Sequence, residues 1–248
     1  ANGAVRGILA QGKKEWFILG VDYAFGKAMT ANVTDFLKDG GGKLVGTTFH
    51  PLNASDFSSF LLQAQASKAS VINLANATSD TVNAIKAARE FGINKSMKMA
   101  GLLVFLTDIH SLGLKNTEGL LLTSSWDWNL NDETRAFGRK FQAKTKRMPT
   151  DIQAANYSAT TNYLKAVEKA GTTDADKVMA VLKSTPLKDF YAEGVIRPDG
   201  RYAHDMYLMQ VKSPSESKEA WDYYKVVSKL PAAQVWTTKE ESKCALWK

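Results

Sequence analysis

The chain has 248 residues, of which 44% are hydrophobic, and this is enough apolar material for one large or two smaller α/β units. Its 32 Lys and Arg against 25 Asp and Glu give a formal net charge of +7, but the basic residues are scattered and no aromatic RNA-binding signature accompanies them. The composition therefore excludes a disordered chain, no apolar run is long enough for a membrane helix, and we expect no nucleic-acid partner.

Five apolar runs rich in β-forming residues predict strands. They cover 16–21, 43–49, 69–75, 97–101 and 119–124. The first four are separated by stretches with apolar residues at helical spacing, as at Met29, Val33 and Phe36. Strands that alternate with helices in this way are typical of right-handed βαβ units. The sequence therefore predicts an α/β fold with a Rossmann-like parallel sheet.

The pattern changes after residue 124. Helical patterns cover 131–146, 151–170 and 174–184, with no apolar strand between them and with Asn131 and Thr173 as predicted N-caps. Residues 196–211 then read as two short strands around a Pro-Asp-Gly turn. A chain that leaves a sheet for helices without a sheet of their own, and then returns to strands, predicts crossing between two lobes.

Three of the predicted strands end in segments suited to a small-molecule site. In an open parallel sheet, ligands bind beyond the carboxyl ends of the strands, next to helix N-termini that favour anions. The candidate residues are Tyr23, Ala24 and Phe25 after the first strand, Asn76, Ala77 and Thr78 after the third, and Leu102 and Leu103 after the fourth. Aromatic, small polar and apolar groups together are the composition of a ligand cleft. A plainer alternative is that Phe25 packs under its helix and that the run at 102–106 covers the sheet edge.

Signatures of catalysis are absent from the sequence. Gly20 to Gly26 has the wrong spacing for a phosphate-binding loop, and neither a G-x-G-x-x-G nor a G-x-S-x-G motif occurs. His50, His110, His204 and Cys244 have no metal-ligand spacing. We therefore expect no enzyme, no cofactor and no metal, and Cys244 is either a free thiol or the half of a bridge whose partner lies outside this sequence.

The run from KKEWFILGVDYAFGKAM to HPLNASDFSSFLLQAQASKASVINLANATSDTVNAIKAAREFGI resembles the second lobe of bacterial periplasmic solute-binding proteins of the leucine/isoleucine/valine type. GLLLTSSW, MPTDIQAANYSATTNYLKAVEKAG and EGVIRPDGRYAHDMYLMQVK are similar to later segments of that family. The resemblance implies a type I, two-lobed fold that closes on its ligand by a hinge. It also implies a periplasmic location and an ABC permease in the inner membrane as partner.

The resemblance further implies how the chain is divided. Residues 1–122 would be the second lobe, 123–190 the helices returning to the first lobe, and 191–248 a C-terminal segment back in the second lobe. Members of the family normally begin with the sheet of the first lobe, so most of that lobe would be missing here. We expect that this chain by itself binds ligand weakly or not at all.

The ligand class is suggested by departures from the family pattern. Amino-acid-binding relatives carry an acidic residue where Leu102 and Leu103 stand, and a tyrosine where Phe25 stands, whereas Tyr157 matches a position near the hinge that often contacts ligand. Because a buried ammonium without a carboxylate is costly, we expect a small carboxylate with an aromatic or apolar body, to which Asn76 and Thr78 would donate hydrogen bonds. The alternatives are an amino-acid-binding member, a ligand-sensing receptor domain of the same fold, or a flavodoxin-like or dehydrogenase-like enzyme.

Overall fold

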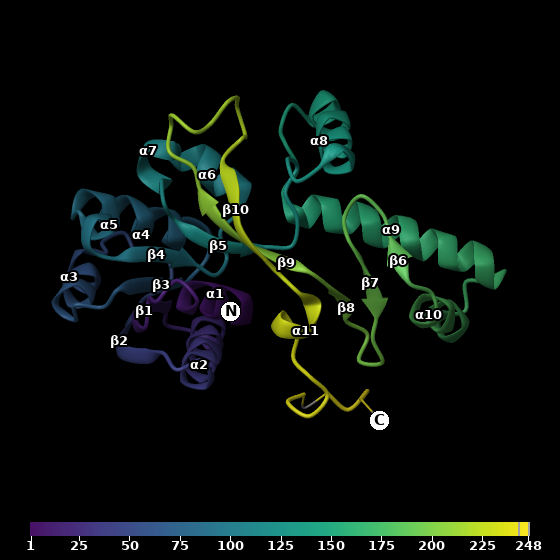
Figure 1. Cartoon of the computed structure of the whole chain (residues 1–248), viewed down its shortest axis with the longest axis horizontal. Helices are drawn as coiled ribbons and strands as arrows, with labels where there is room; N and C mark the ends of the chain where they lie inside the picture. Colours follow the sequence, from purple (N-terminus) through teal and green to yellow (C-terminus); the bar gives the residue numbers. More distant parts are fainter. Residues whose placement is uncertain (243, 248) are drawn as a thin grey trace. The chain divides into compact units, whose positions relative to one another are not determined.

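The structure is a computed structural model that describes residues 1–242 and 244–247. The chain divides into two compact units (Figure 1). Unit 1 consists of Ala1–Thr123 and Tyr207–Ser228, and unit 2 of Ser124–Met206 and Lys229–Lys248. Each unit is described by itself below.

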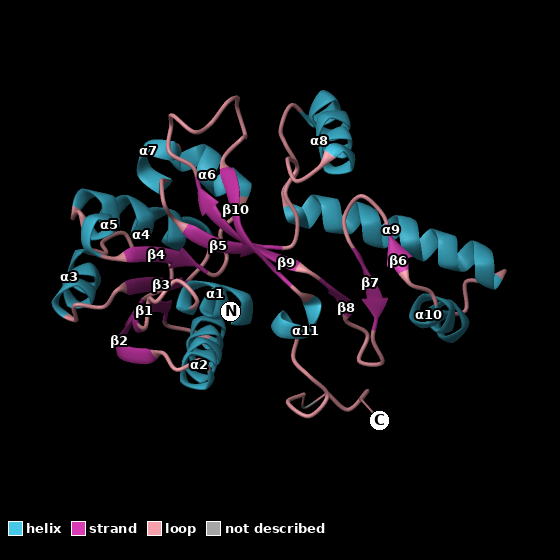
Figure 2. Cartoon of the chain, viewed as in Figure 1, coloured by secondary structure: helices cyan, strands magenta, loops and turns pink. Residues whose placement is uncertain are grey.

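Unit 1 alternates strands with helices, as the sequence predicts (Figure 2). Its strands are β1 (Glu15–Val21), β2 (Lys43–His50), β3 (Val71–Ala75), β4 (Lys98–Gly101) and β5 (Leu121–Ser124). Its helices are α1 (Asn2–Leu9), α2 (Ala24–Asp39), α3 (Ser58–Ala66), α4 (Thr78–Glu90), α5 (Ile93–Ser96), α6 (Leu106–Leu112) and α7 (Leu114–Thr117). All five predicted strands are confirmed, with ends that shift by at most two residues.

The main sheet has seven strands in the order β10-β9-β5-β4-β3-β1-β2, with β9 (Met206–Val211) and β10 (Tyr224–Leu230) joining from late in the chain. Strand β1 pairs in parallel with both β2 and β3, and β3 pairs in parallel with β4. The chain therefore moves outward from β1 to β2 and then crosses to the other side of β1. The carboxyl ends of β1 and β3 flank this change of direction, which is where open α/β sheets bind ligands.

The core of unit 1 lies around the parallel strands. Every residue of β3 and all but the first of β1 are buried, as expected for strands covered by helices on both faces. Trp16, Ile18 and Leu19 have no exposed surface. Burial of each such side chain contributes roughly 1.5–3 kcal/mol to folding. Helix α2 contacts β1, β2 and β3, and α3 contacts β1 and β2, so both helices are positioned directly by the site-bearing strands.

Gly26 explains how the chain turns from β1 into α2. A Cβ atom at this position would lie 2.1 Å from the carbonyl oxygen of Val21, so only glycine lets the first turn of α2 approach the end of β1 this closely. The turn places Tyr23 at the N-cap of α2 with an extended backbone, φ −152° and ψ −179°. The aromatic residues after β1 are therefore held at the edge of the sheet.

Unit 2 is mostly helical. Its helices are α8 (Asp132–Thr145), α9 (Asp151–Ala170), α10 (Ala175–Ser184) and α11 (Ala232–Val235). The predicted N-cap Asn131 is confirmed, because its side chain accepts a hydrogen bond from the backbone N–H of Thr134 at 2.9 Å. The predicted N-cap Thr173 is wrong: Asp174 caps α10 instead and accepts from Lys177 N at 3.1 Å. A carboxylate one residue later takes the position because it also carries the charge that a helix N-terminus favours.

The helices of unit 2 do have a small sheet, contrary to the expectation from sequence. Three antiparallel strands form it in the order β6-β7-β8, with β6 (Leu187–Lys188), β7 (Glu193–Ile196) and β8 (Tyr202–His204). The predicted Pro-Asp-Gly turn joins β7 to β8, with Gly200 at φ +81°. These strands are two to four residues long, too short for a clear alternation of apolar and polar residues. Residues 191–206 are grouped with unit 2.

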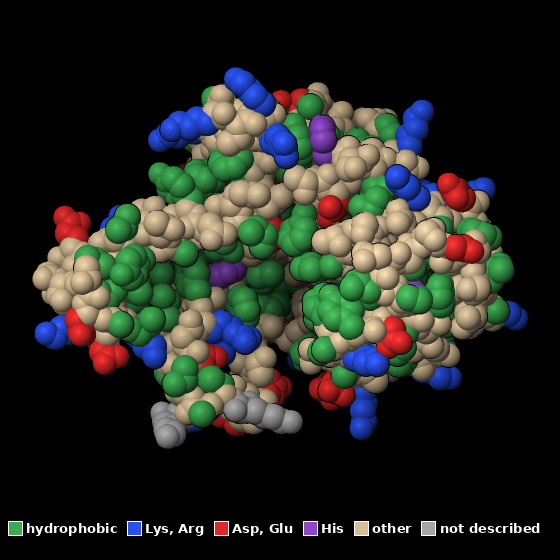
Figure 3. Space-filling view, turned by 180° about the vertical axis from the view of Figure 1, so that it is seen from behind, with side chains coloured by type: hydrophobic (Ala, Val, Ile, Leu, Met, Phe, Trp, Pro, Cys, Tyr) green, Lys and Arg blue, Asp and Glu red, His purple; other side chains and the backbone are tan. Residues whose placement is uncertain are grey.

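Lys and Arg side chains are spread over the face drawn in Figure 3 and lie among Asp and Glu. Within the part of the chain that the structure describes, no helix combines the length and the apolar character that crossing a membrane requires.

Candidate functional site

The loop after β1 presents two aromatic rings. Tyr23 is 42% exposed, and its ring stacks on that of Phe25 with centroids 5.9 Å apart and an interplanar angle of 29°. Asp22 and Lys27 flank the pair and form an exposed ion pair at 2.8 Å, so neither charge stands alone at this loop. Phe25 is half-buried and Ala24 is exposed. The loop therefore presents a partly exposed aromatic surface.

The loop after β3 is organised by a buried side chain. Asn76 has no exposed surface, its Nδ2 atom lies 3.1 Å from Nε2 of His50, and its Oδ1 accepts from the hydroxyl of Thr81 at 2.8 Å. The amide of Asn76 is thus occupied inside unit 1. His50 and Thr81 did not stand out in the sequence, because neither belongs to a recognised motif.

Ala77 and Thr78 follow at the start of α4. Ala77 is the N-cap of α4 in extended conformation, and Thr78 is exposed with a left-handed backbone at φ +54°. A positive φ is costly for a β-branched residue and persists only where the surroundings enforce it. Such strain occurs preferentially at binding and active sites.

The loop after β4 adds apolar groups. Leu102 and Leu103 are half-buried, and the backbone N–H of Leu102 donates to the carbonyl oxygen of Leu74 in β3 at 3.2 Å. The carboxylate of Asp108 accepts from the backbone N–H of Phe105 at 2.9 Å and so fixes the start of α6. Burial raises the pKa of Asp108, and this hydrogen bond acts in the opposite direction. The hydrogen bond to Leu74 joins the loop after β4 to β3, the strand that Asn76 follows.

Two helix N-termini open at this edge without a side-chain cap. Neither Tyr23 at α2 nor Ala77 at α4 accepts a hydrogen bond from its helix through its side chain. The first backbone N–H groups of a helix have no partner within the helix, and they favour an anion. Asp80 in the first turn of α4 is buried, and its Oδ2 accepts from Asn53 N at 3.2 Å. The edge thus combines aromatic surface with anion-binding backbone.

Tyr157 belongs to unit 2, on α9. Its ring is 54% exposed and packs edge-to-face against Phe137 and Phe190, with centroids 5.2 and 5.9 Å away. Phe137 and Phe190 stack on each other at 4.0 Å. Tyr157 is therefore held by an aromatic cluster of unit 2.

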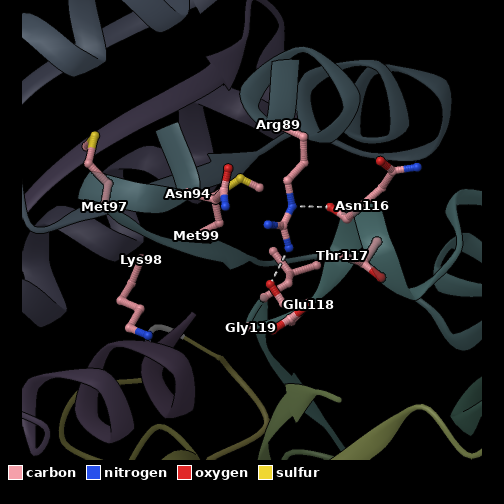
Figure 4. A pocket seen from close by; sticks show the side chains of 10 residues that line it. Arg89, Asn94, Met97, Lys98, Met99, Asn116, Thr117, Glu118 and Gly119 are labelled. Atoms are coloured by element: carbon pink, nitrogen blue, oxygen red, sulfur yellow. Dashed lines mark hydrogen bonds between the residues drawn. The ribbon is translucent and has the colours of Figure 1, made fainter. Parts of the chain in front are cut away.

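A separate cavity of about 240 Å³ lies at the opposite edge of the sheet in unit 1, where β4 begins (Figure 4). Arg89 lines this cavity. Its Nε donates to the carbonyl oxygen of Asn116 at 2.7 Å, and its Nη2 donates to the carbonyl oxygen of Glu118. Burial lowers the pKa of Arg89. Because the guanidinium ties α4 to the carbonyl groups that end α7, its hydrogen bonds serve the packing of unit 1.

Unit 2 has an apolar cavity of about 350 Å³ between α9, α10 and the small sheet. Leu182, Leu187 and Ile196 line it, and so do the rings of Tyr191, Tyr202 and His204. Ser158 and Asn162 also line it, and both donate to Asp189 Oδ2, from Ser158 Oγ at 2.6 Å and from Asn162 Nδ2 at 2.9 Å. Burial lowers the pKa of His204. None of the predicted site residues lines this cavity.

The residues that the structure describes contain no group of three His, Cys, Asp or Glu side chains that could hold a metal ion. Cys244 is exposed as a free thiol.

Comparisons with known proteins identify the family. The periplasmic binding protein family matches residues 1–218. A periplasmic binding protein from Burkholderia mallei is 59% identical, with a TM-score of 0.93 over 100% of this chain and 66% of that one. A branched-chain amino acid ABC transporter periplasmic ligand-binding protein from Burkholderia xenovorans is 41% identical, with a TM-score of 0.91 over 100% and 68%. An ABC transporter solute-binding protein from Rhodopseudomonas palustris, solved with 4-hydroxybenzoate, shares the fold at 21% identity, with a TM-score of 0.80 over 93% and 64%. No curated protein matches the chain.

The chain belongs to the periplasmic binding protein family, and the resemblance seen in the sequence is confirmed. Its mostly parallel α/β architecture is the type I fold of that family. The chain spans 66% of the length of the Burkholderia mallei protein.

Proposed function

We propose that this protein is the ligand-binding component of a branched-chain-amino-acid-type ABC importer, and that it captures a small carboxylate with an aromatic body. Unit 1 acts as the second lobe of the clamshell, and unit 2 carries the helices that return to the first lobe. The two lobes close about the hinge and bind the ligand in the periplasm. The protein then passes the ligand to a permease in the inner membrane. Two relatives support this role. The one at 59% identity is described as a periplasmic binding protein, and the one at 41% identity as a branched-chain amino acid ABC transporter periplasmic ligand-binding protein.

One observation carries the choice of ligand. The uncapped N-termini of α2 and α4 open beside the stacked rings of Tyr23 and Phe25, and Leu102 and Leu103 follow the next strand. The backbone N–H groups suit a carboxylate, and the rings and leucines suit an apolar body. The carboxylate of Asp22 is a poor partner for a ligand ammonium group, because it already pairs with Lys27. The hydroxyl of Thr78 is a hydrogen-bond donor at the same edge. Tyr157 of unit 2 contacts the ligand when the lobes close.

An amino acid is the second candidate, since the 41% identical relative is described as a branched-chain amino acid transporter protein. Isothermal titration calorimetry with 4-hydroxybenzoate and with leucine separates the two. We expect heat of binding from 4-hydroxybenzoate and none from leucine. Binding of leucine alone would replace the proposed ligand class, and a bound compound identified by mass spectrometry of the purified protein would name the solute.

A further inference from the structure

We propose that His50, Asn76 and Thr81 form a buried positioning network that joins the loops after β1 and β3 and sets the backbone shape that these loops present to a ligand. This inference rests on the proposed function, because it concerns the same edge of the sheet. It assigns a positioning role to His50 and Thr81, and to Asn76 in place of the ligand contact expected from the sequence. The three side chains have no exposed surface, so they act through the loops.

The network crosses the sheet edge in a continuous series of hydrogen bonds. The backbone N–H of Asp22, which begins the loop after β1, donates to the carbonyl oxygen of His50 at 2.8 Å. The imidazole of the same residue meets Asn76 Nδ2 at 3.1 Å, and Asn76 Oδ1 accepts from the hydroxyl of Thr81 at 2.8 Å. His50, at the end of β2, is thus bound through its backbone to one loop and through its side chain to the other.

The directions of these hydrogen bonds are mutually consistent. His50 Nδ1 lies 2.8 Å from the carbonyl oxygen of Pro51, which can only accept, so Nδ1 carries the proton. Nε2 of the neutral ring is then an acceptor for Asn76 Nδ2. The hydroxyl of Thr81 donates to Asn76, Asn76 donates to His50, and His50 donates to Pro51. Each side-chain donor has an acceptor, and therefore the network specifies one arrangement.

The surroundings hold the imidazole in place. The ring packs edge-on against Phe57 and Phe60, with centroids 4.8 and 6.2 Å away. Asn76 lies two residues before Thr78, whose φ of +54° is unfavourable for a β-branched residue. A strained conformation persists only where neighbouring structure enforces it, and the amide of Asn76, bonded on both of its polar atoms, supplies that enforcement.

The test compares Thr81→Val, which keeps the shape and loses the hydroxyl, with Thr81→Ser, which keeps the hydroxyl. Asn76→Asp is a second variant, because a carboxylate has no N–H to donate to His50. Amide hydrogen exchange is measured for peptides covering 76–81 and, as an internal reference, 43–49. Binding of 4-hydroxybenzoate is measured by calorimetry on the same 248-residue proteins, and thermal unfolding is followed in parallel.

We expect Thr81→Val and Asn76→Asp to raise exchange of residues 76–81 about tenfold and to weaken binding about tenfold, as for the loss of one buried hydrogen bond. Exchange of 43–49 stays unchanged, and Thr81→Ser stays within about twofold of the unaltered protein in both measurements. Unchanged exchange of 76–81 in both variants would overturn the proposal. So would an equal rise at 43–49, which would show a general loss of stability.

The same experiment separates this inference from the proposed function. If leucine gives heat of binding with the unaltered protein and 4-hydroxybenzoate gives none, the proposed ligand class fails. Exchange of 76–81 then decides alone whether the network positions the loop. If the protein binds and the loop loosens without any loss of affinity, the network does not shape the ligand site, and the inference fails while the proposed function stands.

Discussion

The rings of Tyr23 and Phe25 stack on each other across the first turn of α2, although the two residues are only two positions apart. Residues at this spacing on a regular helix point to different sides. The contact arises because Tyr23 is the extended N-cap and Phe25 is already helical. The turn at Gly26 therefore builds a two-ring surface at the end of β1.

Removal of one ring tests the role of this surface. We expect Phe25→Ala to weaken binding of 4-hydroxybenzoate by about tenfold or more, because the ligand loses an aromatic contact and Tyr23 loses its partner. Calorimetry measures the affinity. Phe25→Tyr is the matched control and should bind within about threefold of the unaltered protein. Equal affinity for the alanine variant would place the ligand elsewhere.

The charge after β4 controls the ligand class. Leu102→Glu places a carboxylate beside the proposed site, where it can pair with the ammonium of an amino acid, so we expect it to introduce measurable binding of leucine. It should also abolish binding of 4-hydroxybenzoate through repulsion between two carboxylates. Leu102→Gln, similar in size but uncharged, should show only the effect of lost apolar surface. If glutamate and glutamine at position 102 give the same ligand preference, charge at this loop does not select the ligand.

The close approach of α2 to β1 at Gly26 leaves no room for a larger side chain. A Cβ atom would meet the carbonyl oxygen of Val21 at 2.1 Å, so Gly26→Ala forces the helix away from β1. We expect it to lower the free energy of unfolding by roughly 2–4 kcal/mol, measured by chemical denaturation. Ala31→Ser on the exposed side of α2 is the control and should change stability by less than about 0.5 kcal/mol. Equal stability of the two variants would mean that the turn can relax.

The sequence predicted the parallel sheet well because its central strands β1 and β3 are continuous apolar runs. WFILGV and VINLA are buried on both faces, so their composition alone distinguishes them from the amphipathic helices between them. The three strands of the small sheet in unit 2 have no such signal. Leu187–Lys188 is only two residues long, and its pairing depends on partners distant in the chain.

Prediction of the site was limited in the same way. The loops after β1, β3 and β4 could be placed together from the sequence because a parallel sheet brings the carboxyl ends of its strands to one edge. The buried role of Asn76 could not, because it depends on His50, 26 residues earlier, and that pairing has no local pattern. Side-chain hydrogen bonds across strands are fixed by packing, and a single sequence does not encode their geometry in any fixed spacing.

Tyr191 makes the stability of unit 2 depend on pH in the alkaline range. Its hydroxyl donates to Ser125 Oγ at 2.8 Å, and burial, aided by the charges of Asp151 and Asp189, raises its pKa from 10.0 to about 12. Between pH 10 and 12 the folded protein keeps this proton while the unfolded chain loses it. Its contribution to stability is therefore complete below pH 10 and is lost as the pH rises to 12.

Denaturation with urea at several pH values measures this effect. We expect the unaltered protein to lose on the order of 1–3 kcal/mol more than Tyr191→Phe between pH 10 and 12, because phenylalanine has no proton to lose. Tyr163, which is 46% exposed, provides the control, and Tyr163→Phe should follow the unaltered protein across the range. Parallel curves for all three proteins would show that the hydroxyl of Tyr191 ionises as easily in the folded state as in the unfolded one. The hydrogen bond to Ser125 would then be exchanged for water in the folded protein.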